Sequence, residues 1–165
     1  MCDTPNGCDR TDSISANQIS NSIRSAFNLP DTPLNQYSPL TFAYIGDSIY
    51  ALVAKTVLVE KSNCPAKELH NMTVKYVSAP AQAKIVRYLM DNDVLTDEEA
   101  DVLRRGRNAK ASSTAKNASV GDYRLATGLE ALVGYLYMDG QMDRLLFILK
   151  KGFDMLDGLE ISENS

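Results

Sequence analysis

The apolar residues of this chain recur with the period of an α-helix, and no segment alternates convincingly with the period of two that a strand requires. Ile19, Ile23 and Phe27, for example, follow one another every four residues, which places them on one helical face. Since every periodic segment follows this pattern, we expect the core to be built from helices alone, in an all-α fold.

Capping signals set the expected bounds of the helices. Ser38 followed by Pro39 is an N-cap with proline at the first helical position, and the apolar segment that follows reaches Lys61 without another proline. We expect this long helix to be mostly buried. Thr96 and Glu99 have the spacing of a capping box. Gly106 is expected to end the helix that Thr96 starts, and 107–121 to form the longest internal loop. Further helices are expected after Pro65, after Ser78, from an N-cap at Asp122 to Gly140, and through Leu145 to Leu156.

Length and composition predict one ordinary globular domain. The chain has 165 residues, of which 44% are hydrophobic and 23% charged, and a chain of this length buries about 70% of its unfolded surface. Two of its three cysteines, Cys2 and Cys8, lie in the polar N-terminal stretch, so no disulfide framework is expected. We expect a flexible polar tail over 1–15, one domain over 16–157 and an acidic tail over 158–165.

The formal charge of −4 does not exclude a nucleic-acid ligand, because the excess acid lies at the two ends. Residues 37–150 hold 14 basic and 13 acidic side chains. The longest apolar run, Ala131 to Met138, has eight residues where a membrane span needs about 20. With no membrane span and no targeting segment in view, we expect a cytoplasmic protein.

Two carboxylates interrupt the apolar helices. Asp47 directly follows Gly46, and Glu130 lies two residues after Gly128, each in a segment apolar enough to be buried. Buried carboxylates are costly unless they are paired or bind a metal, and a small neighbour lets a backbone or a phosphate approach. Two such acids suit Mg²⁺, which keeps several waters. The alternative is that each carboxylate points outward into solvent.

A basic stretch provides the second signal. The 20 residues between Asp101 and Asp122 contain no acid. They favour a polyanion ligand, although a solvated basic face is the ordinary alternative. Lys67 and His70 are spaced to reinforce a phosphate contact, unless the histidine is interfacial or a cap. The candidate phosphate-binding residues are Arg104, Arg105, Arg107, Asn108, Lys110, Lys116, Lys67 and His70.

No nucleophile for covalent catalysis is apparent. The chain has a single histidine, no Cys-His pair and no G-x-S-x-G motif, and it also lacks a zinc pattern and a phosphate-binding glycine loop. A reaction at the two acids would therefore use a metal and water.

Four separated motifs resemble one family. LTFAYIGDSIY at 40–50 is similar to the signature helix of ribonuclease III domains, and LEALVGYLYMDG at 129–140 to their second acidic helix. VSAPAQAKI at 77–85 and RRGRNAK at 104–110 resemble the mini-ribonuclease III subfamily, which lacks a double-stranded-RNA-binding domain. The resemblance covers about residues 36 to 150.

The resemblance implies a homodimeric ribonuclease III endonuclease fold that cleaves double-stranded RNA along a valley at the dimer interface. Asp47 and Glu130 would be its catalytic and metal-binding residues, Mg²⁺ its cofactor with Mn²⁺ as a substitute, and the products would carry 5′-phosphates. Larger ribonuclease III domains have two further acids, at the positions of Ala43 and Thr127. The implied role is maturation of the large-subunit (23S) ribosomal RNA precursor, with a ribosomal protein or pre-ribosomal particle as a further partner.

In the mechanism implied by the resemblance, the metal polarises the phosphodiester, lowers the pKa of an attacking water and stabilises the leaving 3′-oxygen. A non-catalytic helical RNA-binding or ribosome-assembly module on the same fold is the alternative. The presence of both acids beside small residues favours the enzyme.

Overall fold

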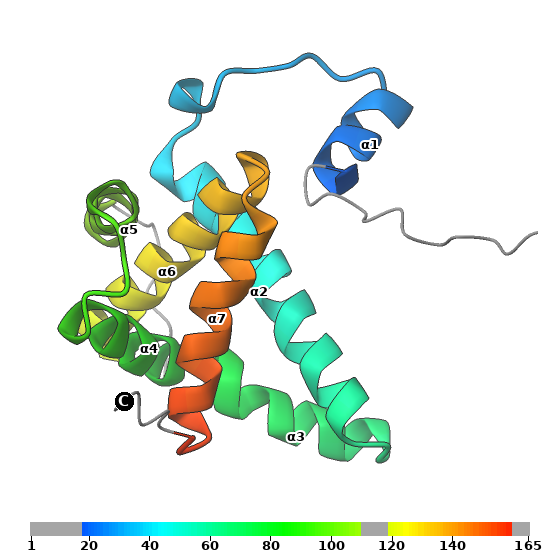
Figure 1. Cartoon of the computed structure of the whole chain (residues 1–165), viewed down its shortest axis with the longest axis vertical. Helices are drawn as coiled ribbons and strands as arrows, with labels where there is room; N and C mark the ends of the chain where they lie inside the picture. The colour runs from blue at the N-terminus through cyan, green and yellow to red at the C-terminus, as the bar shows by residue number, and fades with distance from the viewer. Residues whose placement is uncertain (1–17, 110–118, 160–165) are drawn as a thin grey trace, which may run out of the picture.

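Helix α6 (Val120–Met138) is the centre of the fold, because α2, α4, α5 and α7 all pack against it. The computed structural model in Figure 1 describes residues 18–109 and 119–159, and within these ranges all regular secondary structure is helical, which confirms the all-α fold. Leu129, Leu132 and Leu136 of α6 are almost fully buried. The other elements are α1 (Gln18–Ala26), a 3-10 turn (Leu34–Gln36), α2 (Pro39–Lys61), α3 (Ala66–Val77), α4 (Ala79–Asp91), α5 (Asp97–Asn108) and α7 (Met142–Leu156).

The helix starts predicted from capping residues are confirmed at two places. The Ser38 side chain accepts a hydrogen bond from the Thr41 backbone N–H at the start of α2. At the start of α5, Thr96 and Glu99 form the reciprocal hydrogen bonds of a capping box. These local bonds satisfy donors that a helix leaves unpaired at its first turn.

Two predicted helix bounds are wrong. Gly106 does not end α5, which continues to Asn108, because Gly106 is buried and packs against α6. Ser119, not Asp122, is the N-cap of α6, and its hydroxyl accepts a hydrogen bond from the Asp122 N–H. Arg107 and Asn108 therefore lie on a helix and not in the predicted loop. The predicted loop residues Lys110 and Lys116, the tail 1–15 and residues 160–165 of the acidic tail lie outside the described residues.

Helix α2 is less buried than expected. Tyr44, Leu52 and Val59 are 82%, 58% and 55% exposed. By length and composition alone this helix could cross a membrane, a test that core helices of soluble proteins also pass, and here α2 packs against α3, α5 and α6. Its apolar character is therefore spread over two faces, one in the core and one uncovered.

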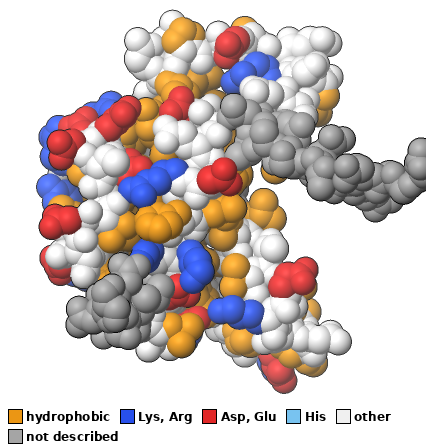
Figure 2. All heavy atoms as spheres, viewed as in Figure 1, with side chains coloured by type: hydrophobic (Ala, Val, Ile, Leu, Met, Phe, Trp, Pro, Cys, Tyr) orange, Lys and Arg blue, Asp and Glu red, His pale blue; other side chains and the backbone are white. Residues whose placement is uncertain are grey.

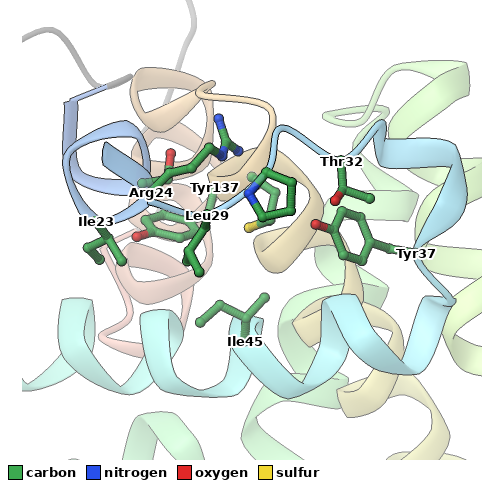
Figure 3. Close-up of a pocket in the computed structure, with 10 residues that line it drawn as sticks. Ile23, Arg24, Leu29, Thr32, Tyr37, Ile45 and Tyr137 are labelled. Atoms are coloured by element: carbon green, nitrogen blue, oxygen red, sulfur yellow. The ribbon is translucent and has the colours of Figure 1, made fainter. Parts of the chain in front are cut away.

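Helix α1 stands apart from the other helices (Figure 1). Of the three apolar residues that recur every four positions, Ile19 and Ile23 are about half exposed and Phe27 is 72% exposed. A cavity of about 340 Å³ lies between α1 with its following loop and the helices α2 and α6 (Figure 3). The lining of this cavity includes Ile23, Tyr37, Ile45 and Tyr137 and contains no carboxylate.

Candidate active site

Two glycines bring α2 and α6 into backbone contact. A Cβ added to Gly46 would lie 1.8 Å from the carbonyl oxygen of Glu130, and one added to Gly134 would lie 1.9 Å from the carbonyl oxygen of Phe42. No side chain fits at either position, so glycine is required for this crossing. The backbone of α6 fills the space beside Gly46. Leu103 of α5 fills the space beside Gly128. Of the two neighbours expected beside these glycines, a backbone or a phosphate, the structure therefore shows the backbone.

The crossing places Asp47 and Glu130 close enough to interact electrostatically. The pKa of Glu130 is raised to about 7, mainly by burial and secondly by the negative charge of Asp47. Glu130 is half-buried, whereas Asp47 is exposed. The sequence prediction that Asp47 is buried is wrong, because its apolar neighbours belong partly to the uncovered face of α2. Nevertheless, the structure brings the two predicted acids together.

Glu130 has one hydrogen-bond donor from a third helix. Gln82 of α4 donates from Nε2 to Glu130 Oε1 at 3.3 Å and to the Val77 carbonyl oxygen at 3.4 Å. Burial raises the pKa of the Tyr50 phenol, and the negative charge of nearby Glu130 raises it further. The Tyr50 hydroxyl donates to the Tyr76 carbonyl oxygen at 2.8 Å. A phenol held in its protonated form in this way is no base or nucleophile.

No ion pair of the described residues offsets the repulsion between the two carboxylates. Neither forms an ion pair with a Lys, Arg or His side chain of the described residues. No group of three or more potential metal-ligating side chains occurs in the described part of the chain. Ala43 is buried, and the Thr127 hydroxyl donates to the Tyr123 carbonyl oxygen, so neither adds a carboxylate ligand. Two carboxylates, of which Asp47 is exposed to water, match the ligand set that Mg²⁺ takes from proteins.

Comparison with known proteins agrees with this geometry. Residues 40–141 match the family model of the Ribonuclease III domain. The chain belongs to the ribonuclease III domain family. It is 47% identical to Mini-ribonuclease 3 of Thermoanaerobacter sp. over 120 residues, and this alignment covers 73% of this chain and 83% of the relative. Mini-ribonuclease 3 of Staphylococcus aureus is 42% identical over 124 residues, covering 75% and 92%.

A solved structure supports the fold. The crystal structure of protein FN1578 from Fusobacterium nucleatum aligns with a TM-score of 0.66 at 22% identity, covering 73% of this chain and 97% of that chain. The activity follows from the family match and from the relatives named Mini-ribonuclease 3: this all-helical domain is an endoribonuclease, a hydrolase of RNA phosphodiester bonds.

The predicted RNA-binding residues are not gathered at one place in this ribonuclease III domain. Arg104 and Arg105 are exposed on α5, and both pair with Asp101. Arg107 packs over α6 beside Gly128, and its Nε donates to Asn108 Oδ1 at 3.3 Å. The stretch without acids therefore begins next to an acid that partly neutralises two of its arginines.

Lys67 and His70 lie on a different part of the ribonuclease III domain. Both are exposed on α3, and His70 borders a pocket with Lys55 and Val59 of α2. At a rise of about 1.5 Å per residue, Lys55 and Val59 are about 12 and 18 Å along α2 from Asp47. The structure does not bring Lys67 and His70 to the acidic pair.

Sequence reasoning missed Gln82. It occupies the first position of an i, i+3, i+4, i+7 stripe with Ile85, Val86 and Leu89, and all four are buried. A polar residue in a buried stripe was the signal that could have found it.

Proposed function

We propose that this ribonuclease III domain hydrolyses double-stranded RNA as a homodimer, with Mg²⁺ held by Asp47 and Glu130. The observation that supports this proposal is the contact of α2 with α6 at Gly46, which brings Asp47 and Glu130 together while neither carboxylate forms an ion pair with a basic side chain of the described residues. A divalent cation bound by both carboxylates would remove the repulsion between them. A phosphate oxygen of RNA can bind the same cation from the side of exposed Asp47.

The chain's own residues divide the work at the site. Glu130, half-buried and hydrogen-bonded by Gln82, is the fixed ligand, and exposed Asp47 faces the side that RNA can reach. When bound, Mg²⁺ supplies Lewis-acid chemistry at the phosphodiester and at the attacking water. Since the buried Tyr50 hydroxyl is held by the Tyr76 carbonyl, water is the nucleophile that fits.

The uncovered face of α2 favours dimerisation. Tyr44, Leu52 and Val59 fall within an arc of about 80° around the helix. Hydrophobic side chains also reach the surface over α2 and α3 in Figure 2. A second copy of the chain that covers this face would lie beside the acidic pair, because Tyr44 is less than one helical turn from Asp47. Two such sites would then line one RNA-binding valley.

A-form RNA suits such a valley, because its phosphates and 2′-hydroxyls are accessible while its deep major groove is not. The proposed substrate is the large-subunit (23S) ribosomal RNA precursor, bound free or within a pre-ribosomal particle in the cytoplasm. The relation to proteins named Mini-ribonuclease 3 supports this choice. Sequencing the ends of large-subunit RNA in cells that lack the gene tests it, and mature ends in those cells would contradict the assignment.

The cleavage proposal is tested with a long RNA duplex. We expect cleavage in Mg²⁺, none in chelator, and products that carry 5′-phosphates. Asp47→Asn should abolish cleavage while the protein stays folded and binds RNA. The matched control is Asp143→Asn, which removes an exposed carboxylate from α7 and should leave cleavage unchanged. Full cleavage by Asp47→Asn would contradict the site, and a folded wild type that binds RNA without cutting it would favour the non-catalytic RNA-binding module.

A further inference from the structure

Gln82 occupies a position where an apolar side chain is expected. Its side chain is 1% exposed, on the same face of α4 as Ile85, Val86 and Leu89. Its Nε2 contacts Glu130 and the Val77 carbonyl oxygen, whereas its Oε1 is buried without a hydrogen-bond partner among the described residues. Gln82 therefore spans from the start of α4 to the end of α3 and to the acidic site on α6.

Packing does not explain this glutamine. A buried amide oxygen without a partner costs free energy, and a methionine or leucine would fill similar space without that cost. What glutamine adds is an N–H donor aimed at the Glu130 carboxylate. A glutamate side chain has three rotatable bonds, and a hydrogen bond to one of its oxygens restricts them.

We infer that Gln82 is a positioning residue of the metal site: its amide N–H holds the Glu130 carboxylate in the orientation from which Glu130 and Asp47 share one divalent cation. This inference rests on the proposed function of the two acids. Residues that hydrogen-bond metal ligands from behind orient those ligands, and removing such a residue typically weakens metal binding or activity 10–100-fold.

The competing explanation is that Gln82 serves the end of α3. Val77 is the last residue of that helix, where carbonyl groups lack intrahelical partners. Tyr50 does the same for the neighbouring carbonyl of Tyr76. Tyr50→Phe is therefore a matched control, since it removes a hydrogen bond from the same helix end and leaves the contact between Gln82 and Glu130 in place.

The test measures Mn²⁺ binding to the RNA-free protein by electron paramagnetic resonance, together with the Mg²⁺ dependence of duplex cleavage. For Gln82→Met we expect unchanged folding by circular dichroism, a Kd for Mn²⁺ about 10-fold higher, and a similar rise in the Mg²⁺ concentration for half-maximal cleavage. Tyr50→Phe should leave both values unchanged. Gln82→Leu repeats the measurement with a differently shaped side chain, so that a packing defect peculiar to methionine is recognised.

A double-mutant cycle shows whether Gln82 acts through Glu130. In a Glu130→Gln background, Gln82→Met should weaken Mn²⁺ binding no further. Unchanged Mn²⁺ affinity in both Gln82 variants, or an equal loss in Tyr50→Phe, would overturn the inference while leaving the acidic site intact. Unchanged Mn²⁺ binding and cleavage in Asp47→Asn and Glu130→Gln would instead overturn the proposed function.

Discussion

At the scale of single residues, the two acids of the site differ in their surroundings. Glu130 is half-buried, and its pKa is raised to about 7 by burial and then by the charge of Asp47. Between pH 4.5, the ordinary value for glutamate, and pH 7, the folded protein therefore binds a proton that the unfolded chain has lost. In this window folding becomes less favourable as the pH rises.

This shift predicts a pH dependence of stability. In metal-free buffer, the free energy of unfolding should fall by up to about 3 kcal/mol from Glu130 alone as the pH rises from 4.5 to 7. Urea denaturation of the wild type and of Glu130→Gln at pH 5 and pH 8 isolates this contribution, because the amide does not titrate. Equal pH dependence in the two proteins would show that Glu130 is ionised at its ordinary pKa.

The arginines of α5 also differ from one another. Arg104 and Arg105 share Asp101, whereas Arg107 packs over α6 beside Gly128 and forms no ion pair among the described residues. We expect Arg107→Ala to weaken RNA binding and to reduce the slope of log K against log salt by about 1. Arg104→Ala is the comparison and should change the slope less. The measurement is fluorescence anisotropy with a labelled duplex in Ca²⁺, and equal slopes in the two variants would contradict a special position of Arg107.

At the scale of helices, the α2–α6 crossing determines the site. Gly46→Ala would force a Cβ to within 1.8 Å of the Glu130 carbonyl oxygen, so the helices must separate. We expect a loss of about 1–3 kcal/mol in unfolding free energy, and slower cleavage because both acids move. Gly121→Ala is the matched control, since its Cβ would lie 3.8 Å from Ser119 Oγ, and alanine should stabilise the first turn of α6 slightly. Similar stability of the two variants in thermal unfolding would contradict this account.

The same crossing shows where prediction from the sequence stopped. Ser38 and Thr96 announce their helices because caps are local, and both starts were predicted correctly. Gly106 was mistaken for a helix end, because a glycine that ends a helix and one that admits a neighbouring helix look alike until the neighbour is known. The acidic pair was found because Asp47 and Glu130 each interrupt an apolar helix, although the assumption that Asp47 is buried was wrong.

At the scale of the whole molecule, the single chain leaves the apolar face of α2 uncovered next to its acidic pair. This face also explains why α2 was predicted to be mostly buried: a sequence does not distinguish apolar residues that face the chain's own core from those that face another copy. Gln82 escaped notice for the converse reason, since its partner Glu130 is 48 residues away along the chain.

Tyr44 provides the sharpest test of the dimer. It is 82% exposed, and in a symmetric dimer Tyr44→Glu would bury two unpaired charges at the interface. The cost of burying even one such charge predicts a dimer Kd at least about 100-fold higher. Analytical ultracentrifugation should then show a folded monomer, with cleavage reduced because the proposed RNA-binding valley needs a wall from each copy. Leu146→Glu, on α7 at 42% exposure, is the control and should remain dimeric. A stable dimer of Tyr44→Glu would move the interface away from this face.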